Sequence, residues 1–129
     1  MANRKLLALV SEDTELGRWA LTRALEAEGF EVQAVSNWVE ASSWLARARF
    51  SLAVVAVSSA PENCADIVAY VRQHHPHTHL VLLADQDSIG ELQLACGPKT
   101  DILAKPLDLE EVVHAAHSRP VVGDETLGT

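Results

Sequence analysis

The feature that most constrains the fold of this chain is a repeated alternation between short apolar runs and longer segments with helical spacing. Three of the apolar runs are nearly continuous in Leu, Val and Ala, which is typical of strands that helices cover on both faces. The alternation predicts a parallel sheet in which each strand is followed by a helix. The expected strands are Leu6 to Val10, Glu31 to Val35, Leu52 to Val57, Leu80 to Ala84 and Ile102 to Ala104.

The first helix is expected to begin at Asp13 or Thr14, because either side chain can cap a helix N-terminus, and to end at Gly29. Its apolar residues recur at helical spacing, so one face is expected to be buried. The expected stripe consists of Leu16, Ala20, Ala24 and Ala27, with Leu21 and Leu25 beside it.

Capping signals mark the starts of further helices. Asn37, Ser88 and Asp108 each have a glutamate three residues later, which is the spacing of a capping box. The helix from Ser88 is expected to end at Gly97, although Gly90 lowers its helical propensity. The faces expected to be buried are Trp38, Ala41, Trp44, Leu45 and Ala48 in the second helix, Cys64, Ile67, Val68 and Val71 in the third, and Leu109, Val112, Val113 and Ala116 in the last.

These elements favour one α/β domain with a flavodoxin-like, doubly wound, five-stranded parallel sheet and helices on both faces. Right-handed crossovers restrict the strand order, and 2-1-3-4-5 is a common solution. In such a sheet the functional crevice lies at the carboxyl ends of strands 1, 3 and 4. The domain is expected to span residues 1–118, with a flexible tail or the start of a linker at residues 119–129.

Composition narrows the range of partners. Ten basic and eighteen acidic side chains give a formal net charge of -8, which disfavours binding to nucleic acid or to an anionic membrane. No apolar run approaches the roughly 20 residues of a membrane span, and the start of the chain has no signal-peptide core. Cys64 and Cys96 are isolated and are expected to be small core residues. We therefore expect a cytoplasmic protein.

Several segments resemble the response-regulator receiver domain family. The stretch Lys5 to Leu16 (KLLALVSEDTEL), followed by Leu25 to Val32 (LEAEGFEV), is similar to the opening of a receiver. Phe50 to Val57 resembles its third strand, and Asp101 to Glu111 (DILAKPLDLEE) resembles its fifth strand, its Lys-Pro pair and the start of its last helix. The resemblance extends to about Ser118.

The resemblance implies a site that accepts a phosphoryl group on an aspartate at the end of the third strand. Such a site needs an acidic pair for Mg²⁺ after the first strand and a carboxylate nucleophile. It also needs a hydroxyl after the fourth strand and a lysine after the fifth, both of which contact the phosphoryl group. An aromatic residue on the fifth strand usually moves with the hydroxyl.

The matched positions lack most of these groups. Ser11 and Glu12 stand where the acidic pair is expected, so one carboxylate remains. The acceptor position falls on Ala56 if the third strand is aligned from its start, or on Val57 if it is aligned from the proline that follows. Neither side chain can be phosphorylated. Ser58 and Ser59 are expected to cap the loop after the strand.

The remaining positions follow the same trend. Ala84 stands at the hydroxyl position and Ile102 at the aromatic position, whereas Lys105, followed by Pro106, matches the family. Lys105 is expected either to pair with Glu12 across the crevice or to remain as an inherited Lys-Pro turn. A partly exposed pair of this kind would contribute at most about 1 kcal/mol. The sequence predicts a degenerate receiver, or pseudo-receiver.

The expected function is a non-enzymatic signalling module without a cofactor, in a bacterial-type two-component or related pathway. Receivers commonly use the face formed by the fourth helix, the fifth strand and the last helix. The resemblance therefore implies contact with a protein partner, or with a second copy of the chain, through this face. The candidate residues there are Glu110, Glu111, His114 and His117.

Other functions stay open. A working receiver would use Glu12 or Asp13 as an unusual acceptor. A metal-binding module would use the loop from residue 74 to 79, where His75, His77 and His79 alternate, because imidazoles suit Zn, Ni or Cu. A polar surface loop is the plainer interpretation of these histidines. A nucleotide or flavin site is poorly supported, since the loop after the first strand is not glycine-rich.

Overall fold

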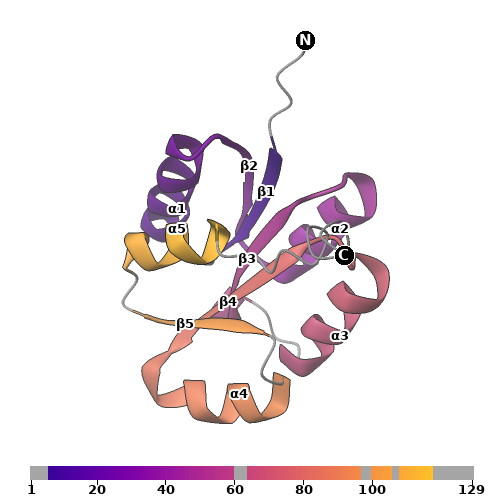
Figure 1. Cartoon of the computed structure of the whole chain (residues 1–129), viewed down its shortest axis with the longest axis vertical. Helices are drawn as coiled ribbons and strands as arrows, with labels where there is room; N and C mark the ends of the chain where they lie inside the picture. Colours follow the sequence, from indigo (N-terminus) through magenta and orange to yellow (C-terminus); the bar gives the residue numbers. More distant parts are fainter. Residues whose placement is uncertain (1–5, 60–63, 97–99, 106–107, 118–129) are drawn as a thin grey trace, which may run out of the picture.

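The strands form one parallel sheet in the order β2-β1-β3-β4-β5, as expected (Figure 1). A computed structural model describes residues 6–59, 64–96, 100–105 and 108–117. The strands are β1 (Leu6–Ser11), β2 (Phe30–Val35), β3 (Leu52–Ala56), β4 (His79–Asp85) and β5 (Asp101–Lys105). The helices are α1 (Glu15–Ala27), α2 (Trp38–Arg47), α3 (Cys64–His74), α4 (Ile89–Cys96) and α5 (Leu109–His117). Short 3₁₀ turns at Val57–Ser59 and Gln86–Ser88 follow β3 and β4.

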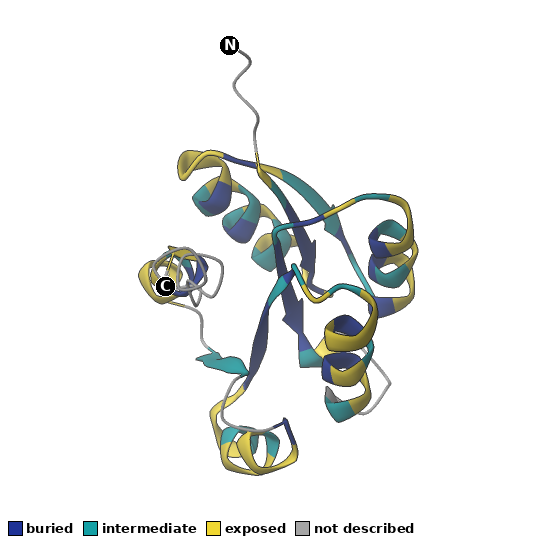
Figure 2. Cartoon of the chain, turned by 45° about the vertical axis from the view of Figure 1, so that its right-hand side comes forward, coloured by how far each residue is buried: buried dark blue, intermediate teal, exposed yellow. Residues whose placement is uncertain are grey.

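Two apolar cores lie on opposite faces of the sheet. One core is formed with α1 and α5, and the other with α2 and α3 together with Cys96 at the end of α4. Successive residues of β3 contribute to alternate cores, and all five of its residues are buried (Figure 2). Burial on both faces explains why this strand is continuously apolar in sequence.

Helix α1 turns a different face to the core than the sequence predicts. Thr14 is the N-cap, and its hydroxyl accepts a hydrogen bond from the amide of Gly17 at 3.1 Å. The buried residues of α1 are Leu21 and Leu25, whereas Leu16 is 75% exposed, so the expected stripe through Leu16 and the alanines is wrong. The two leucines lie one turn apart, and burying them removes more apolar area from water than burying the alanines would.

Helix α1 ends as expected, and the cap of α2 is also confirmed. Gly29 follows α1 with a φ of +98°, a conformation that glycine adopts without strain. Asn37 caps α2, and its Oδ1 accepts a hydrogen bond from the amide of Glu40 at 2.9 Å. The Glu40 carboxylate in turn accepts from the amide of Ser36 at 3.4 Å, which is close to the reciprocal bond of a capping box.

The other helices bury most of the expected positions. In α2, Trp38, Ala41 and Leu45 are buried and Trp44 is half-buried. In α5, Ala115 is buried together with Val112 and Ala116, whereas Leu109 is exposed, so the prediction for Leu109 is wrong. The buried residues of α3 include Ile67, Val68 and Val71. The side chain of Cys64 lies outside the described residues. Among the described helices, none has both the length and the apolar character needed to cross a bilayer.

Candidate functional site

The candidate site is the crevice at the carboxyl ends of the strands. Strands β1, β3, β4 and β5 are parallel neighbours, so their last residues meet at one edge of the sheet. These residues are Ser11, Ala56, Asp85 and Lys105. The segment that leads from β1 into α1 and the turn after β3 complete the crevice, since side chains from both contact each other there.

Glu12 is buried, and both of its carboxylate oxygens face donors. The residue is 1% exposed. Its Oε2 accepts hydrogen bonds from the amide of Thr14 at 2.9 Å and from the Thr14 hydroxyl at 2.8 Å. Its Oε1 lies 3.0 Å from Nζ of Lys105. The backbone is also held, because Arg18 donates to the Glu12 carbonyl at 2.9 Å and the Glu12 amide donates to Val35 at 3.1 Å.

Gly17 makes this conformation of Glu12 possible. A Cβ atom at position 17 would lie 2.6 Å from Oγ1 of Thr14 and 2.9 Å from both Cγ and Cδ of Glu12. Carbon atoms do not approach this closely, so any larger residue would displace Thr14, Glu12 or both. The absence of a side chain at Gly17 is therefore what lets the carboxylate fold back over the start of α1.

The ion pair between Lys105 and Glu12 is present, but it is not the partly exposed pair that the sequence suggests. The side chain of Lys105 is 24% exposed, and that of Glu12 is 1% exposed. Removing one partner of a buried pair costs about 3–5 kcal/mol, because the other charge is left without compensation. The limit of about 1 kcal/mol for an exposed pair therefore does not apply to the loss of Lys105. Pro106 lies outside the described residues.

Asp13 points to the other side of the crevice and contacts the turn after β3. The hydroxyl of Ser58 donates to Oδ1 of Asp13 at 2.6 Å. This hydrogen bond lowers the pKa of Asp13 below 3.8; the charge of Lys105 adds to the effect, and burial opposes it. Of the two expected caps of α1, Thr14 takes the role, so Asp13 is available to join the loops after β1 and β3.

Aliphatic residues occupy the positions where a receiver has its phosphoryl acceptor, its hydroxyl and its aromatic residue, and the structure places most of them in buried surroundings. Ala56, the last residue of β3, is fully buried, and Val57 begins the following turn with intermediate exposure. Ala84 is 4% exposed near the end of β4, and Ile102 packs on the core from β5. Whichever alignment of β3 is used, an aliphatic side chain occupies the end of the strand. Ser11 is fully buried at the end of β1.

The histidines after α3 are not brought together as one set of ligands. His79 begins β4, and its Nε2 lies 2.6 Å from Oδ2 of Asp101 on β5. His75 and His77 contact each other through their rings, with centroids 6.3 Å apart. Within residues 6–59, 64–96, 100–105 and 108–117, no three His, Cys, Asp or Glu side chains are grouped to hold a metal ion. The acidic neighbour of His79 comes from a later strand, so the loop sequence does not predict it.

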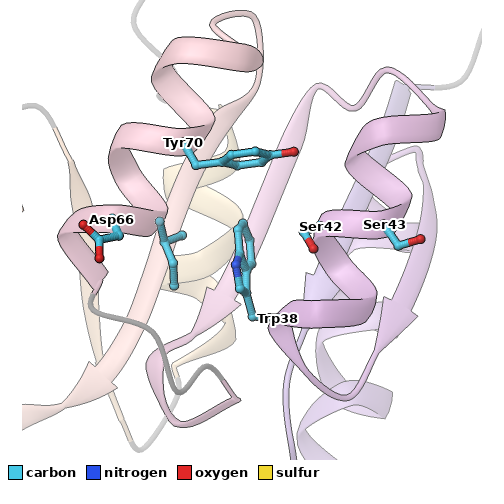
Figure 3. Close-up of a pocket in the computed structure, with 6 residues that line it drawn as sticks. Trp38, Ser42, Ser43, Asp66 and Tyr70 are labelled. Carbon is cyan, nitrogen blue, oxygen red and sulfur yellow. The ribbon is translucent and has the colours of Figure 1, made fainter.

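A cavity of about 390 Å³ lies between α2 and α3 (Figure 3). Trp38 and Tyr70 meet edge to face there, with ring centroids 6.0 Å apart. Ser42 and Ser43 line the α2 side, and the Tyr70 hydroxyl points toward α2, as Figure 3 shows. None of its described lining residues belongs to the crevice, so the cavity is a separate feature of the α2–α3 packing.

The residues expected on the interaction face separate into two places. Glu110, Glu111 and His114 line a groove beside β5. His117 does not line this groove: its Nε2 lies 2.8 Å from Oε1 of Glu28, at the end of α1. His117 therefore joins α5 to α1, and the predicted interaction face through Glu110, Glu111, His114 and His117 stays a prediction.

The start of α1 contains the residues that sequence reasoning missed. Thr14 was expected only as a helix cap, and neither Gly17 nor Arg18 was expected near the crevice. Glycine in the first turns of a helix costs about 1 kcal/mol relative to alanine, so its presence there is a signal of a close approach. That signal, applied to Gly17, could have indicated a side chain folded over this turn.

Comparison with known proteins identifies the fold class of this chain. No family model matches the sequence. The structure of a response regulator receiver domain protein from Clostridium thermocellum superposes with a TM-score of 0.79 at 17% identity, over 96% of this chain and 99% of that one. The chain therefore has the fold of the response-regulator receiver domains, which confirms the expected fold class.

Two curated proteins are similar in sequence. The chain is 32% identical over 116 residues to the photosynthetic apparatus regulatory protein RegA of Cereibacter sphaeroides, covering 88% of this chain and 61% of RegA. It is 28% identical over 106 residues to the DNA-binding transcriptional regulator NtrC of Azospirillum brasilense, covering 81% of this chain and 22% of NtrC. The chain thus spans only part of each relative, and the similarity supports a receiver domain of two-component signalling.

Proposed function

We propose that this chain is a pseudo-receiver, a signalling module that is not phosphorylated and acts through contact with a protein partner. The observation that carries the proposal is the ion pair between Glu12 and Lys105 beside the apolar end of β3. In receivers, the corresponding lysine pairs with the phosphoryl charge. Here Glu12 supplies that negative charge permanently, which favours a single fixed state. The module has no enzymatic activity and uses no cofactor.

The chemistry of the crevice supports this proposal. An acyl phosphate forms on a carboxylate nucleophile, and the candidate positions Ala56 and Val57 have none. Mg²⁺ requires several oxygen ligands in near-octahedral geometry. The Glu12 carboxylate is already engaged by Thr14 and Lys105, so a cation would have to displace both.

The test is to treat the full chain with acetyl phosphate, or with beryllofluoride, in the presence of Mg²⁺. We expect no phosphoryl mass gain in the intact-mass spectrum and no change in the amide NMR signals of Ala84 and Lys105. A phosphoryl mass gain, or large shifts of these two signals, would overturn the proposal. A conventional receiver treated in parallel shows that the reagents are active.

A working receiver with Asp13 as acceptor is the second candidate. Asp13 is exposed, unlike Glu12, so a phosphodonor can reach its carboxylate. In that case the mass gain would appear in the natural chain and in Glu12→Gln, and it would be lost in Asp13→Asn. If the gain were lost only in Glu12→Gln, the acceptor would be Glu12 instead.

The metal-binding alternative has its own measurement. Titration with Zn²⁺ or Ni²⁺ would show micromolar or tighter binding that is lost when His75 and His77 are replaced. We expect only weak binding, because His79 already faces Asp101.

The proposed setting is a cytoplasmic two-component or related regulatory pathway. We assign residues 1–118 to the module and residues 119–129 to a tail or linker.

A further inference from the structure

The cavity between α2 and α3 has a buried apolar floor and an open rim. The floor is formed by Trp38 and Ile67, which are buried and belong to the apolar core on this face of the sheet. Ser43 and Asp66 line the cavity from exposed positions, so it opens to solvent between the two helices. Its volume of about 390 Å³ lies within the usual range of small-molecule sites.

Tyr70 gives the cavity an aromatic wall that other rings hold in place. Its ring is edge-on to Trp38, with an interplanar angle of 88°. His74 and His75 contact the same ring, with centroid distances of 4.9 and 5.5 Å. Burial lowers the pKa of His75 below 6.5, so this neighbour is mainly uncharged at pH 7. Aromatic rings attract one another in offset and edge-on arrangements, so an aromatic guest would extend this cluster.

The wall on α2 is small and polar. Ser42 lines the cavity there, and a larger side chain at this position would fill part of it. The Ser42 hydroxyl donates to the Val39 carbonyl at 2.9 Å, so its oxygen remains able to accept a hydrogen bond. The Tyr70 hydroxyl points toward α2 (Figure 3) and can donate or accept. A guest in the cavity therefore meets both aromatic rings and hydroxyl groups.

The charge around the cavity disfavours an anionic guest. Among the described lining residues, Asp66 is the one carboxylate, and there is no Lys, Arg or His. The Asp66 carboxylate points away from the two aromatic rings (Figure 3), so the space beside the rings is neutral. The net charge of -8 adds a general repulsion of anions.

We propose that this cavity binds a small, neutral, planar aromatic molecule that carries a hydroxyl group. The ring of the guest packs against Tyr70 and Trp38, and its hydroxyl accepts a hydrogen bond from Tyr70 and donates one to Ser42. Burial of the ring against the apolar floor supplies most of the affinity. The described residues that line the cavity do not include Glu12 or Lys105, so the proposal stands whether or not the crevice is phosphorylated.

The probe for the test is 2-naphthol, an aromatic molecule of two fused rings with one hydroxyl group. It is titrated into the untreated full chain and followed by NMR. We expect shifts confined to residues 38–43 and 66–70, among them the indole N–H of Trp38. The size of the probe leads us to expect a dissociation constant on the order of 0.1–1 mM.

Two analogues of similar size test the chemistry of the guest. Decahydro-2-naphthol keeps the hydroxyl but has no aromatic ring, and we expect it to bind roughly five- to tenfold more weakly. 2-Naphthoate carries a carboxylate in place of the hydroxyl. We expect it to bind at least about tenfold more weakly, because its charge would be buried without a cation beside it.

Two substitutions at one position separate the cavity from the rest of the surface. Ser42→Leu adds an apolar side chain that occupies the cavity, and leucine is the better helix former, so the chain stays folded. We expect this variant to bind 2-naphthol at least about tenfold more weakly. Ser42→Ala keeps the cavity open and removes one hydroxyl, so we expect less than about a threefold loss. Circular dichroism checks that both variants are folded.

Three results would overturn the proposal. The first is unchanged binding in Ser42→Leu, or shifts spread over the whole surface, which would place the probe elsewhere. The second is equal affinity for 2-naphthol and its saturated analogue, which would remove the role of the aromatic rings. The third is a concentration-dependent shift of the same signals in the free chain, which would identify a second copy of the chain as the occupant.

Discussion

At the scale of single residues, the crevice depends on how one buried carboxylate is compensated. Burial removes the Glu12 carboxylate from water. Two hydrogen bonds from Thr14 and the ammonium group of Lys105 replace its contacts with solvent. The two partners of the ion pair are unequal, because Lys105 keeps some contact with solvent and Glu12 has almost none. Loss of the lysine therefore leaves a buried charge, whereas loss of the carboxylate leaves a cation that can turn outward.

We predict that Lys105→Met destabilises the chain by about 3 kcal/mol, because the charge of Glu12 would be left buried and unpaired. Glu12→Gln should cost only about 1 kcal/mol, since an amide keeps an acceptor for Thr14 and the lysine can reach water. Urea unfolding of the two variants and the natural chain measures both values. Equal costs, or a larger cost for Glu12→Gln, would contradict the asymmetry between the two partners.

A second prediction concerns Asp13, whose pKa is lowered mainly by the hydroxyl of Ser58. Ser58→Ala removes the 2.6 Å hydrogen bond, so the pKa of Asp13 should rise toward 3.8 in an NMR titration of the carboxyl carbon. Because the folded state lowers this pKa, the stabilisation is present above the unfolded pKa and is lost as pH falls through the folded value, below about 3.9.

The control for Ser58→Ala is Ser42→Ala, which removes a hydroxyl that donates to the Val39 carbonyl on α2. It should leave the pKa of Asp13 unchanged. An unchanged pKa in Ser58→Ala as well would show that the Asp13–Ser58 contact does not persist in solution.

At the scale of secondary structure, the first turn of α1 has two roles. Thr14 caps the helix through Gly17 and also donates to Glu12, while Arg18 donates to the Glu12 backbone. The helix start and the crevice are therefore one hydrogen-bonded unit. A change in the first turn of α1 is expected to alter the crevice even where no crevice side chain is replaced.

The glycines of α1 and α4 provide a matched test of this unit. Gly17→Ala would place a methyl group 2.6 Å from Thr14 Oγ1, so we expect it to destabilise the chain by about 1–3 kcal/mol. Gly90→Ala meets nothing within 4 Å and should stabilise the chain by about 0.5–1 kcal/mol through helix propensity.

Urea unfolding measures both glycine variants, and the NMR signals of Glu12 and Lys105 should move only in Gly17→Ala. Stabilisation by Gly17→Ala would mean that Glu12 does not fold over this turn in solution.

At the scale of the whole molecule, the fold was predictable because its signals are local and agree with one another. The apolar runs marked the strands, and Asn37 and Gly29 marked helix boundaries that the structure confirms. The buried face of α1 was not predictable in the same way. It depended on whether the alanine stripe or the pair Leu21 and Leu25 buried more area against the sheet.

The sequence predicted which residues lie at the candidate site better than it predicted their burial and their contacts. The sequence left open whether Glu12 and Lys105 would pair, and it did not indicate that Glu12 would be buried, since burial depends on the space left by Gly17. The pairing of His79 with Asp101, 22 residues apart, follows from how β4 and β5 lie side by side. Such contacts arise from tertiary structure and leave no periodic pattern in the sequence.

The extent of the domain gives a further prediction. Among the residues that the structure describes, both cores are complete enough to cover the two faces of the sheet, and α5 closes one of them through Val112, Ala115 and Ala116. We therefore expect a chain that ends at residue 118 to unfold at the same urea concentration as the full chain. A lower midpoint for the shortened chain would place residues 119–129 within the cooperatively folded domain.

Under the proposed pseudo-receiver function, the engagement of Glu12 has a consequence for any attempt to introduce a phosphorylation site into this crevice. An aspartate introduced at Ala56 or Val57 would meet a lysine whose charge is already matched and a neighbouring carboxylate that Thr14 and Gly17 hold in place. One substitution is therefore insufficient. A phosphorylation site needs two changes, one that introduces the aspartate and one that releases the Glu12 side chain. We expect neither change alone to give a response to a phosphodonor, and we expect their combination to give one.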